Sequence, residues 1–108
     1  MYFYDPKQRG TKELAPGART RTFWGDKMTL SIVEIDPNSE VPRHTHPHEQ
    51  GGMMIEGELE MNIAGESKLL KPGDVYIIPG NVEHWARTRN TPARVMDIFS
   101  PVREEFKY

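Results

Sequence analysis

Histidines are concentrated in one short stretch of the sequence. His44, His46 and His48 fall within five residues, whereas His84, the last of the four, stands alone behind a turn at 79–81. A neutral imidazole nitrogen is a donor suited to Zn, Ni, Cu and Fe. On a β-strand, residues two apart project to the same face, so His44 and His46 can bind one ion side by side. The stretch therefore predicts a metal site, and a polar loop with chance histidines is the alternative.

Asp97 is a candidate for proton transfer. If residues 93–99 form a strand, Asp97 and Phe99 share one face of it. With that face turned inward, burial among apolar side chains would raise the pKa of Asp97 and suit it to proton transfer near neutral pH. With that face turned outward, Asp97 would be solvated or paired with Arg94 or Arg87.

Arg103 is a candidate for binding an acidic group. It follows Pro101 in a charged C-terminal segment, from which an extended chain can fold over a neighbouring cavity. A guanidinium group pairs with a carboxylate through two parallel hydrogen bonds. A surface position is the alternative for Arg103, and Arg19 and Arg21 are weaker candidates for the same task.

The composition excludes several classes of protein and site. At 108 residues, the chain is long enough for one domain with a modest core. Its formal charge of −2 comes from interspersed charges. Without a basic block or a long apolar run, we expect neither a nucleic-acid partner nor a membrane partner. The absence of cysteine excludes disulfides, thiolate ligands and a cysteine nucleophile. No secretion signal is recognisable, so we expect a cytoplasmic protein.

Short strands separated by turns are the elements predicted to position these residues. Apolar and polar residues alternate in many segments, and nine glycines and nine prolines mark turns. The apolar run at 75–78 predicts a buried strand. The histidine strand should end near His46, because Pro47 cannot donate to a strand ladder. The other predicted strands are 18–24, 28–35, 50–55, 58–63, 67–70, 84–87 and 93–99.

Roughly eight to ten such strands favour an all-β sandwich or barrel. No segment shows the apolar period of a long helix. We expect residues 1–17 to form an N-terminal arm, residues 18–100 the β-barrel, and residues 101–108 a C-terminal tail that folds near the barrel mouth.

Two segments resemble the paired motifs of the cupin family. The first motif, G-x5-H-x-H-x3-E-x6-G, corresponds to residues 38–57, and the second, G-x5-P-x-G-x2-H-x3-N, to residues 73–88. Two motifs in the correct order and spacing form a specific signal. The departures from them are Asn38 and Asn81 in place of glycine, Thr88 in place of asparagine and Gln50 in place of glutamate.

The resemblance implies a single-domain cupin, that is, a double-stranded β-helix or jelly-roll barrel. It puts His44, His46, Gln50 and His84 at the ligand positions of one divalent transition metal, for which Ni, Zn, Fe, Mn and Co are all suitable. Because these four ligands are neutral, the ion would keep its full charge and act as a strong Lewis acid. A metal that only stabilises the barrel is the alternative. Cupins commonly dimerise, so we expect a homodimer.

A narrower resemblance links the sequence to the small cupins of pectin and alginate breakdown. It rests on residues 44–50 and 97–106, with a similar opening at residues 2–5. Members of that group ketonise 4,5-unsaturated monouronates to linear keto sugars. The resemblance implies a small sugar acid as the substrate. It also implies that Asp97, Phe99 and Arg103 serve the reaction beside the metal.

Two other functions remain open for the same fold. One is a different metal-dependent cupin enzyme, such as an Fe(II) dioxygenase, which Gln50 does not exclude. The other is a cupin that binds a small molecule without turnover. Oxygen consumption would identify the first, and tight binding of sugar acids without reaction would identify the second.

Overall fold

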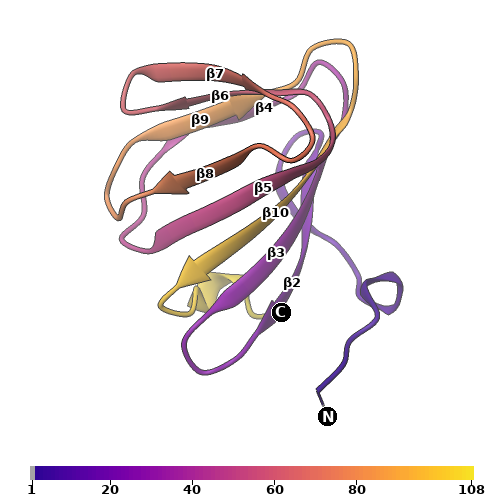
Figure 1. Ribbon diagram of the computed structural model, residues 1–108. Helices are drawn as coiled ribbons and strands as arrows, with labels where there is room; N and C mark the ends of the chain where they lie inside the picture. The colour runs from indigo at the N-terminus through magenta and orange to yellow at the C-terminus, as the bar shows by residue number, and fades with distance from the viewer. Residues whose placement is uncertain (1) are drawn as a thin grey trace.

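Residues 2–108, which this computed structural model describes, form ten strands and two short 3-10 helices (Figure 1). The helices are η1 (Pro6–Gln8) and η2 (Glu104–Phe106). The strands are β1 (Lys12–Ala15), β2 (Ala18–Trp24), β3 (Thr29–Ile35), β4 (Glu40–His44), β5 (Glu49–Gly57), β6 (Leu59–Ile63), β7 (Glu66–Leu70), β8 (Val75–Ile78), β9 (His84–Arg87) and β10 (Ala93–Ser100).

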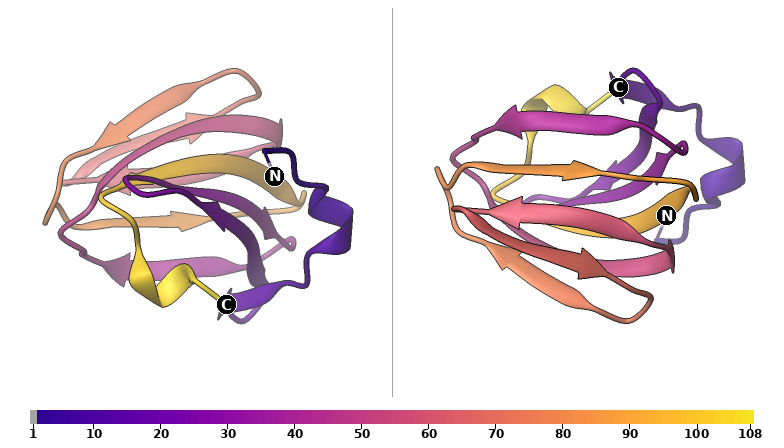
Figure 2. Two further views of the ribbon diagram at one scale, coloured as in Figure 1. Left: turned by 90° about the horizontal axis from the view of Figure 1, so that it is seen from below. Right: turned by 90° about the horizontal axis from the view of Figure 1, so that it is seen from above.

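The strands pair into two antiparallel sheets that face each other (Figure 2). The six-stranded sheet has the order β1-β2-β3-β10-β5-β8, and the four-stranded sheet the order β4-β9-β6-β7. Most neighbours in the sheets are distant in the sequence, as in jelly rolls. The predicted all-β class with jelly-roll architecture is therefore confirmed.

The core lies between the two sheets, and each strand reaches it with every second residue. In β3, Thr29, Ser31, Val33 and Ile35 are buried, and the residues between them are partly exposed. The buried aliphatic residues of both sheets form one cluster. Two strands near the site also bury hydroxyl groups, which pair with each other: Thr20 Oγ1 lies 2.6 Å from Ser31 Oγ.

Strand β8 departs from the predicted buried strand at 75–78. Tyr76 and Ile78 are buried, but Val75 and Ile77 are 66% and 62% exposed. β8 forms one edge of the six-stranded sheet, and its outer face points to solvent. The prediction was therefore wrong for one face, because an apolar run does not tell whether one or both faces of a strand are covered.

The turns around the histidines follow the sequence motifs closely. β4 ends at His44, two residues before the predicted end near His46. Asn38 and Asn81, which replace motif glycines, have φ angles of 55° and 64°. Asparagine adopts this left-handed region more readily than most residues. The backbone geometry of the two motif turns is thus kept without glycine.

Both chain ends pack against the six-stranded sheet. Part of the expected arm forms β1, which pairs with β2. At the other end, the Arg103 amide donates a hydrogen bond to Thr29 Oγ1 at 3.0 Å, and Phe106 is buried. These contacts hold the C-terminal tail beside β3 and β10. Among residues 2–108, no helix is both long and apolar enough to cross a membrane.

Candidate metal centre and catalytic site

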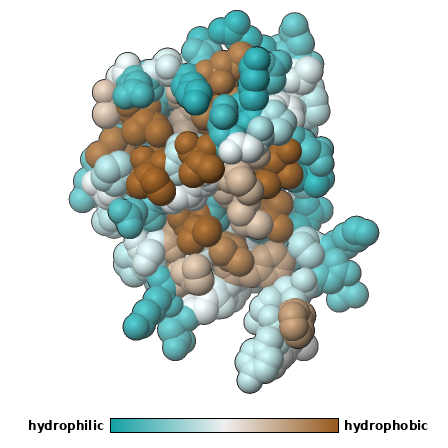
Figure 3. Space-filling view, viewed as in Figure 1, coloured by the Kyte–Doolittle hydropathy of each residue, from teal (hydrophilic) through white to brown (hydrophobic). Residues whose placement is uncertain are grey.

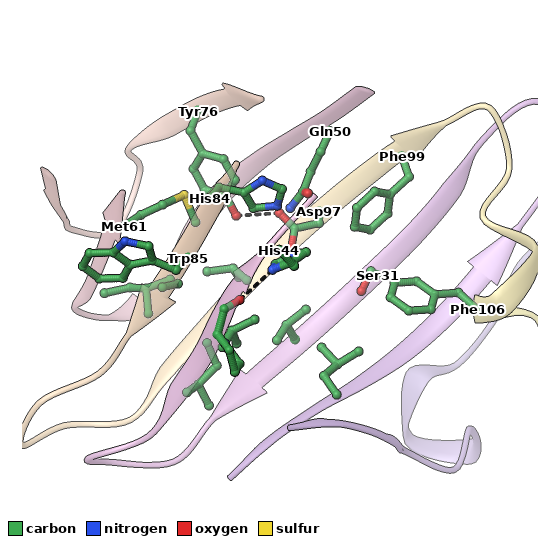
Figure 4. Close-up of a pocket in the computed structure, with 18 of the residues that line it drawn as sticks. Ser31, His44, Gln50, Met61, Tyr76, His84, Trp85, Asp97, Phe99 and Phe106 are labelled. Carbon is green, nitrogen blue, oxygen red and sulfur yellow. Dashed lines mark hydrogen bonds between the residues drawn. The ribbon is translucent and has the colours of Figure 1, made fainter. Parts of the chain in front are cut away.

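Three of the four histidines converge between the two sheets. Figure 4 shows two of them, His44 and His84, beside Asp97. His44 ends β4 and lies directly opposite His84, which begins β9. His46 follows in the loop after β4. One ligand atom from each of the three lies within 4.8 Å of the other two. Separate segments therefore bring together the histidines that the sequence singled out.

Backbone carbonyls hold all three imidazole rings in one tautomer. In each ring, Nδ1 lies within hydrogen-bond distance of the carbonyl of a residue two positions away. Because a carbonyl can only accept, each Nδ1 carries the proton and each Nε2 keeps a free lone pair. The acceptors are Pro42 for His44 at 2.7 Å, His48 for His46 at 3.0 Å and Val82 for His84 at 2.8 Å.

The Nε2 atoms and Gln50 form a donor set that fits a metal ion. The Nε2 atom of His84 is buried and has no hydrogen-bond partner within residues 2–108. Gln50 is also buried, and its Oε1 lies 3.0 Å from His46 Nε2, so two lone pairs face each other. Two ligands at right angles, each about 2.1 Å from an ion, are separated by about 3.0 Å. A bound cation would explain both the His84 Nε2 atom without a partner and the short distance between His46 Nε2 and Gln50 Oε1.

Burial favours, in His46 and His84, the neutral form that a metal requires. It lowers the pKa of His84 to about 4, assisted by the neighbouring histidines and Arg103. Burial also lowers the pKa of His46, and the positive charge of Arg103 acts in the same direction. Both imidazoles are therefore unprotonated at neutral pH, which leaves their lone pairs available as ligands.

Asp97 lies next to this cluster, on the inner face of β10. It pairs in register with Gly52 of β5, which in turn pairs with Tyr76 of β8. The Tyr76 hydroxyl donates a hydrogen bond to Asp97 Oδ1 at 2.5 Å. Burial raises the pKa of Asp97 to about 6, and contacts with Tyr76, Gln50 and Arg103 offset part of the rise. A carboxyl group with this pKa can both give and take a proton near neutral pH.

Gly52 provides the space in which the Tyr76 and Asp97 side chains meet. A Cβ atom at Gly52 would lie 2.2 Å from Tyr76 Cζ and 2.4 Å from Asp97 Oδ1. Burial and the adjacent Asp97 carboxylate raise the pKa of Tyr76, so Tyr76 stays a phenol and donates its proton to the hydrogen bond. The contact between Tyr76 and Asp97 therefore depends on the absence of a side chain at Gly52.

The sequence did not identify Tyr76 as the partner of Asp97. The alternative partners, Arg94 and Arg87, instead lie near glutamates at the protein surface. To predict this pair, the strand order β8-β5-β10 must be known, because Tyr76 and Asp97 lie on β8 and β10 with β5 between them. No local sequence pattern reveals that order.

Arg103 and Phe99 lie at the same end of the cavity as the histidines. The Arg103 guanidinium stacks 4.8 Å from the centre of the Phe99 ring and 4.0 Å from that of Phe106. Its Nε donates to Glu105 at 2.6 Å, and within residues 2–108 its terminal nitrogens have no hydrogen-bond partner. The Phe99 ring lies 5.5 Å from that of His46. Arg103 is thus held in place with two nitrogens available to an anion.

Three other residues weighed from the sequence do not enter the site through their side chains. Arg19 and Arg21 pair with acidic residues on the outer face of the six-stranded sheet. His48 contributes its carbonyl group, which orients His46, and its ring stands 5.7 Å from the His46 ring. These two arginines are therefore not brought near the histidine cluster.

A cavity of about 450 Å³ connects these groups. His44, His84 and Gln50 line it together with Asp97 and Arg103. Its volume is typical of small-molecule sites, in which a few polar groups converge within a largely apolar wall. The arrangement can hold a cation, bind an anionic group and exchange a proton at neighbouring points.

The chain is similar to cupins in both sequence and structure. Residues 31–99 match the Cupin domain family. The pectin degradation protein KdgF of Dickeya dadantii (strain 3937) is 29% identical over 107 residues, which cover 97% of this chain and 96% of that protein. An RmlC-like cupin from Shewanella frigidimarina NCIMB 400 has a TM-score of 0.91 at 28% identity, covering 98% of this chain and 96% of that one. KdgF from Halomonas sp. has a TM-score of 0.89 at 25% identity, covering 97% of each chain.

Proposed function

The chain belongs to the cupin family, and we propose that it is a metal-dependent isomerase that opens and ketonises 4,5-unsaturated uronates from pectin or alginate, giving linear keto sugar acids. One observation carries this proposal: the buried carboxyl group of Asp97 shares a cavity with the histidine cluster and with Arg103. The similarity to a pectin degradation protein over 97% of the chain supports the substrate class.

The proposed reaction moves a proton without any redox change. A proton leaves the C1 hydroxyl of the ring, the bond from C1 to the ring oxygen breaks, and an enol forms at C5. A proton then arrives at C4 while the enol oxygen loses its own proton, and the enol becomes a ketone. The site must therefore bind the carboxylate, stabilise negative charge on the C5 oxygen and deliver a proton to C4.

The metal ligands in this proposal are His44, His46, His84 and Gln50. A divalent transition metal bound there, such as Ni, Zn, Fe, Mn or Co, supplies Lewis-acid stabilisation of the oxygen on which charge develops. The four uncharged side chains leave that charge undiminished. They also come from three strands, β4, β5 and β9, and from the loop after β4, so they fix the site relative to both sheets.

Asp97 and Arg103 divide the remaining tasks between them. Arg103 binds the uronate carboxylate through its two free terminal nitrogens, in the parallel geometry that a guanidinium favours. Asp97, with a pKa of about 6, transfers the proton at C4. Tyr76 holds the Asp97 carboxyl in one orientation, and Phe99 supports the guanidinium and covers that wall of the cavity.

The proposal is tested with the product mixture of a pectate or alginate lyase. We expect the metal-loaded protein to accelerate the loss of ultraviolet absorbance from the conjugated double bond. Asp97→Asn should lower kcat by at least about a hundredfold, because a positioned proton donor contributes on that scale. Asp26→Asn, at an exposed aspartate, is the matched control. Activity of Asp97→Asn close to that of the wild type would remove Asp97 from the mechanism.

Two other outcomes would assign the cavity a different function. Oxygen consumption with an Fe(II)-loaded protein, without loss of the conjugated double bond, would indicate a dioxygenase. Binding of sugar acids at micromolar concentration without any product would indicate a non-catalytic cupin. Both measurements use the same purified chain, so the three functions can be compared directly.

A further inference from the structure

The cavity extends beyond Asp97 into a part with a different chemical character. Strand register puts Ser31 beside Asp97, and one layer further Val33 beside Val95. From that layer onward the cavity is lined by buried aliphatic side chains from β3, β6 and β10, here called the aliphatic wall. Its members are Val33, Ile35, Leu59, Met61 and Val95.

The aliphatic wall and the anion-binding end lie on opposite sides of Asp97. Figure 4 shows Phe99 and Phe106 on one side of Asp97 and the histidines, and Met61 on the other. Arg103 stacks on those two phenylalanine rings. A ligand whose carboxylate pairs with Arg103 therefore extends past Asp97 towards Met61.

The aliphatic wall offers no hydrogen bond to a ligand. Ser31, the nearest polar residue, already shares its hydroxyl with Thr20 at 2.6 Å. The other polar residues that line the cavity beyond Asp97 are Lys12, Glu13 and Arg43, on the edge strands β1 and β4, and Trp85 of β9, whose ring stacks with Arg87. Glu13 and Arg43 are exposed to solvent. A sugar hydroxyl next to the aliphatic wall would lose its bonds to water without replacement, whereas a hydrocarbon group would gain from leaving water.

We propose that the aliphatic wall is a second subsite, which takes the hydrocarbon arm of a monocarboxylate whose acid group is bound at Arg103. The ligand class is a carboxylic acid with a compact aliphatic or aromatic arm. A monouronate, with hydroxyls on most carbons, uses only the polar end of the same cavity. The inference shares with the proposed function the position of the carboxylate, but it requires no turnover.

Calorimetric titration of the full chain with four acids tests the subsite. The acids are acetate, 3-phenylpropionate, gluconate and adipate. We expect 3-phenylpropionate to bind at least about tenfold more tightly than acetate, because its ring is removed from water. Gluconate, of similar length but hydroxylated, should bind more weakly than 3-phenylpropionate, because its hydroxyls would lose water beside the aliphatic wall. Adipate should bind more weakly than 3-phenylpropionate, since its second carboxylate would face the aliphatic wall.

A substitution that preserves shape locates the effect in the aliphatic wall. Val33→Thr replaces one methyl group by a hydroxyl, and we expect 3-phenylpropionate to bind at least about threefold more weakly, with the acetate affinity as internal reference. Val75→Thr makes the same change on the exposed face of β8 and serves as the matched control. The unfolding midpoint of each variant verifies that the fold is kept.

Methionine methyl resonances report on the subsite without any substitution. With methyl-labelled methionine, 3-phenylpropionate should shift the Met61 signal through the field of its aromatic ring. Met53, whose side chain is on the outer face of β5 and 43% exposed, should not move. Acetate should leave both signals in place.

The outcomes separate this inference from the proposed function. The subsite would be overturned by equal affinities for acetate and 3-phenylpropionate, or by a Met61 signal that does not shift. It would also be overturned if adipate bound most tightly, because its second carboxylate would then pair with Lys12 at the far end of the cavity. Turnover of unsaturated uronates together with one of these results would leave the proposed function intact. If 3-phenylpropionate binds as expected but unsaturated uronates are not turned over, the subsite proposal stands and the proposed isomerase function is refuted.

Discussion

At Asp97 the fold retains a carboxyl group in surroundings that disfavour its charge. The side chain is only 6% exposed, and its pKa is raised from 3.8 to about 6. Because the folded state favours the protonated form, stability is highest at low pH with respect to this group and is lost as the pH rises from about 4 through 6. Such a cost is typical of functional sites, where a reactive group is kept at the expense of stability.

Asp97→Asn should therefore stabilise the metal-free protein in a pH-dependent way. At pH 8 we expect its free energy of unfolding to exceed that of the wild type by about 2–3 kcal/mol, the equivalent of a two-unit shift in pKa. The difference should vanish near pH 4, where Asp97 is protonated. Urea unfolding of the wild type and of Asp97→Asn between pH 4 and pH 8 measures this difference, with Asp26→Asn as control. A difference that stays constant with pH would show that ionisation of Asp97 is not its cause.

Gln50 sets the charge of the proposed metal site. A glutamate there would add a negative charge beside the ion, which strengthens binding and weakens the Lewis acid. We expect Gln50→Glu to retain metal at chelator concentrations that strip the wild type, and to lower kcat by about tenfold or more. Metal analysis after dialysis against the chelator and uronate kinetics measure the two effects. Gln8→Glu, at an exposed glutamine, controls for the added charge. Easier loss of metal from Gln50→Glu would contradict a ligand role for residue 50.

At the scale of the strand, β5 shows how two adjacent glycines differ in function. A Cβ atom at Gly52 would collide with both Tyr76 and Asp97, whereas at Gly51 it would meet only Ile77 Cδ1, at 3.4 Å. We expect Gly52→Ala to displace the Tyr76 and Asp97 pair and to lower kcat by about tenfold or more, since small misplacements of a catalytic group are costly. Gly51→Ala, one residue away on the same strand, should keep its activity. Kinetics and unfolding midpoints of both variants test this, and equal losses of activity would refute the distinction.

The strands themselves could be predicted from the sequence, but their partners could not. A period of two is a local signal, and it located most strands within one or two residues. The order of strands in a sheet is set by long-range packing, so the meeting of Tyr76 with Asp97 across Gly52 had no local signature. The same limit explains the error at β8, where the pattern of Val75 and Ile77 cannot tell which face of the sheet is covered.

The candidate site was more accessible to prediction than its surroundings. Histidine spacing and the two cupin motifs identified the cluster that the structure brings together, because the type and spacing of these residues can be read directly from the local sequence. The roles of Asp97 and Arg103 were predicted from their chemistry and supported by the family resemblance, that of Phe99 came from the resemblance alone, and all three stay predictions. Their positions depend on β10 and on the C-terminal tail. Composition alone does not predict where that tail packs on the sheet.

At the scale of the whole molecule, one part of the outer face of the six-stranded sheet, over β8, β5 and β10, carries exposed apolar side chains. Val75 and Ile77 of β8, Met53 of β5 and Ile98 of β10 are all more than 40% exposed, and Figure 3 shows hydrophobic surface running across this side of the protein. A contiguous apolar surface of this kind marks an interaction site. A flat sheet face can pack against its own copy about a two-fold axis, the commonest symmetry of soluble oligomers.

We therefore expect a homodimer in which two such sheet faces pack together. Ile77→Lys puts a charge into the apolar surface of each subunit, and burying that charge in the interface would oppose association. Light scattering coupled to size-exclusion chromatography should give twice the 12.4 kDa chain mass for the wild type and a single chain mass for Ile77→Lys.

Met28→Lys, at an exposed methionine in the turn between β2 and β3, should remain a dimer. Because the histidine cluster lies between the sheets and Ile77 points outward, the Ile77→Lys monomer should still bind metal. A wild-type chain that elutes as a monomer at micromolar concentration, or an Ile77→Lys variant that stays dimeric, would rule out this interface.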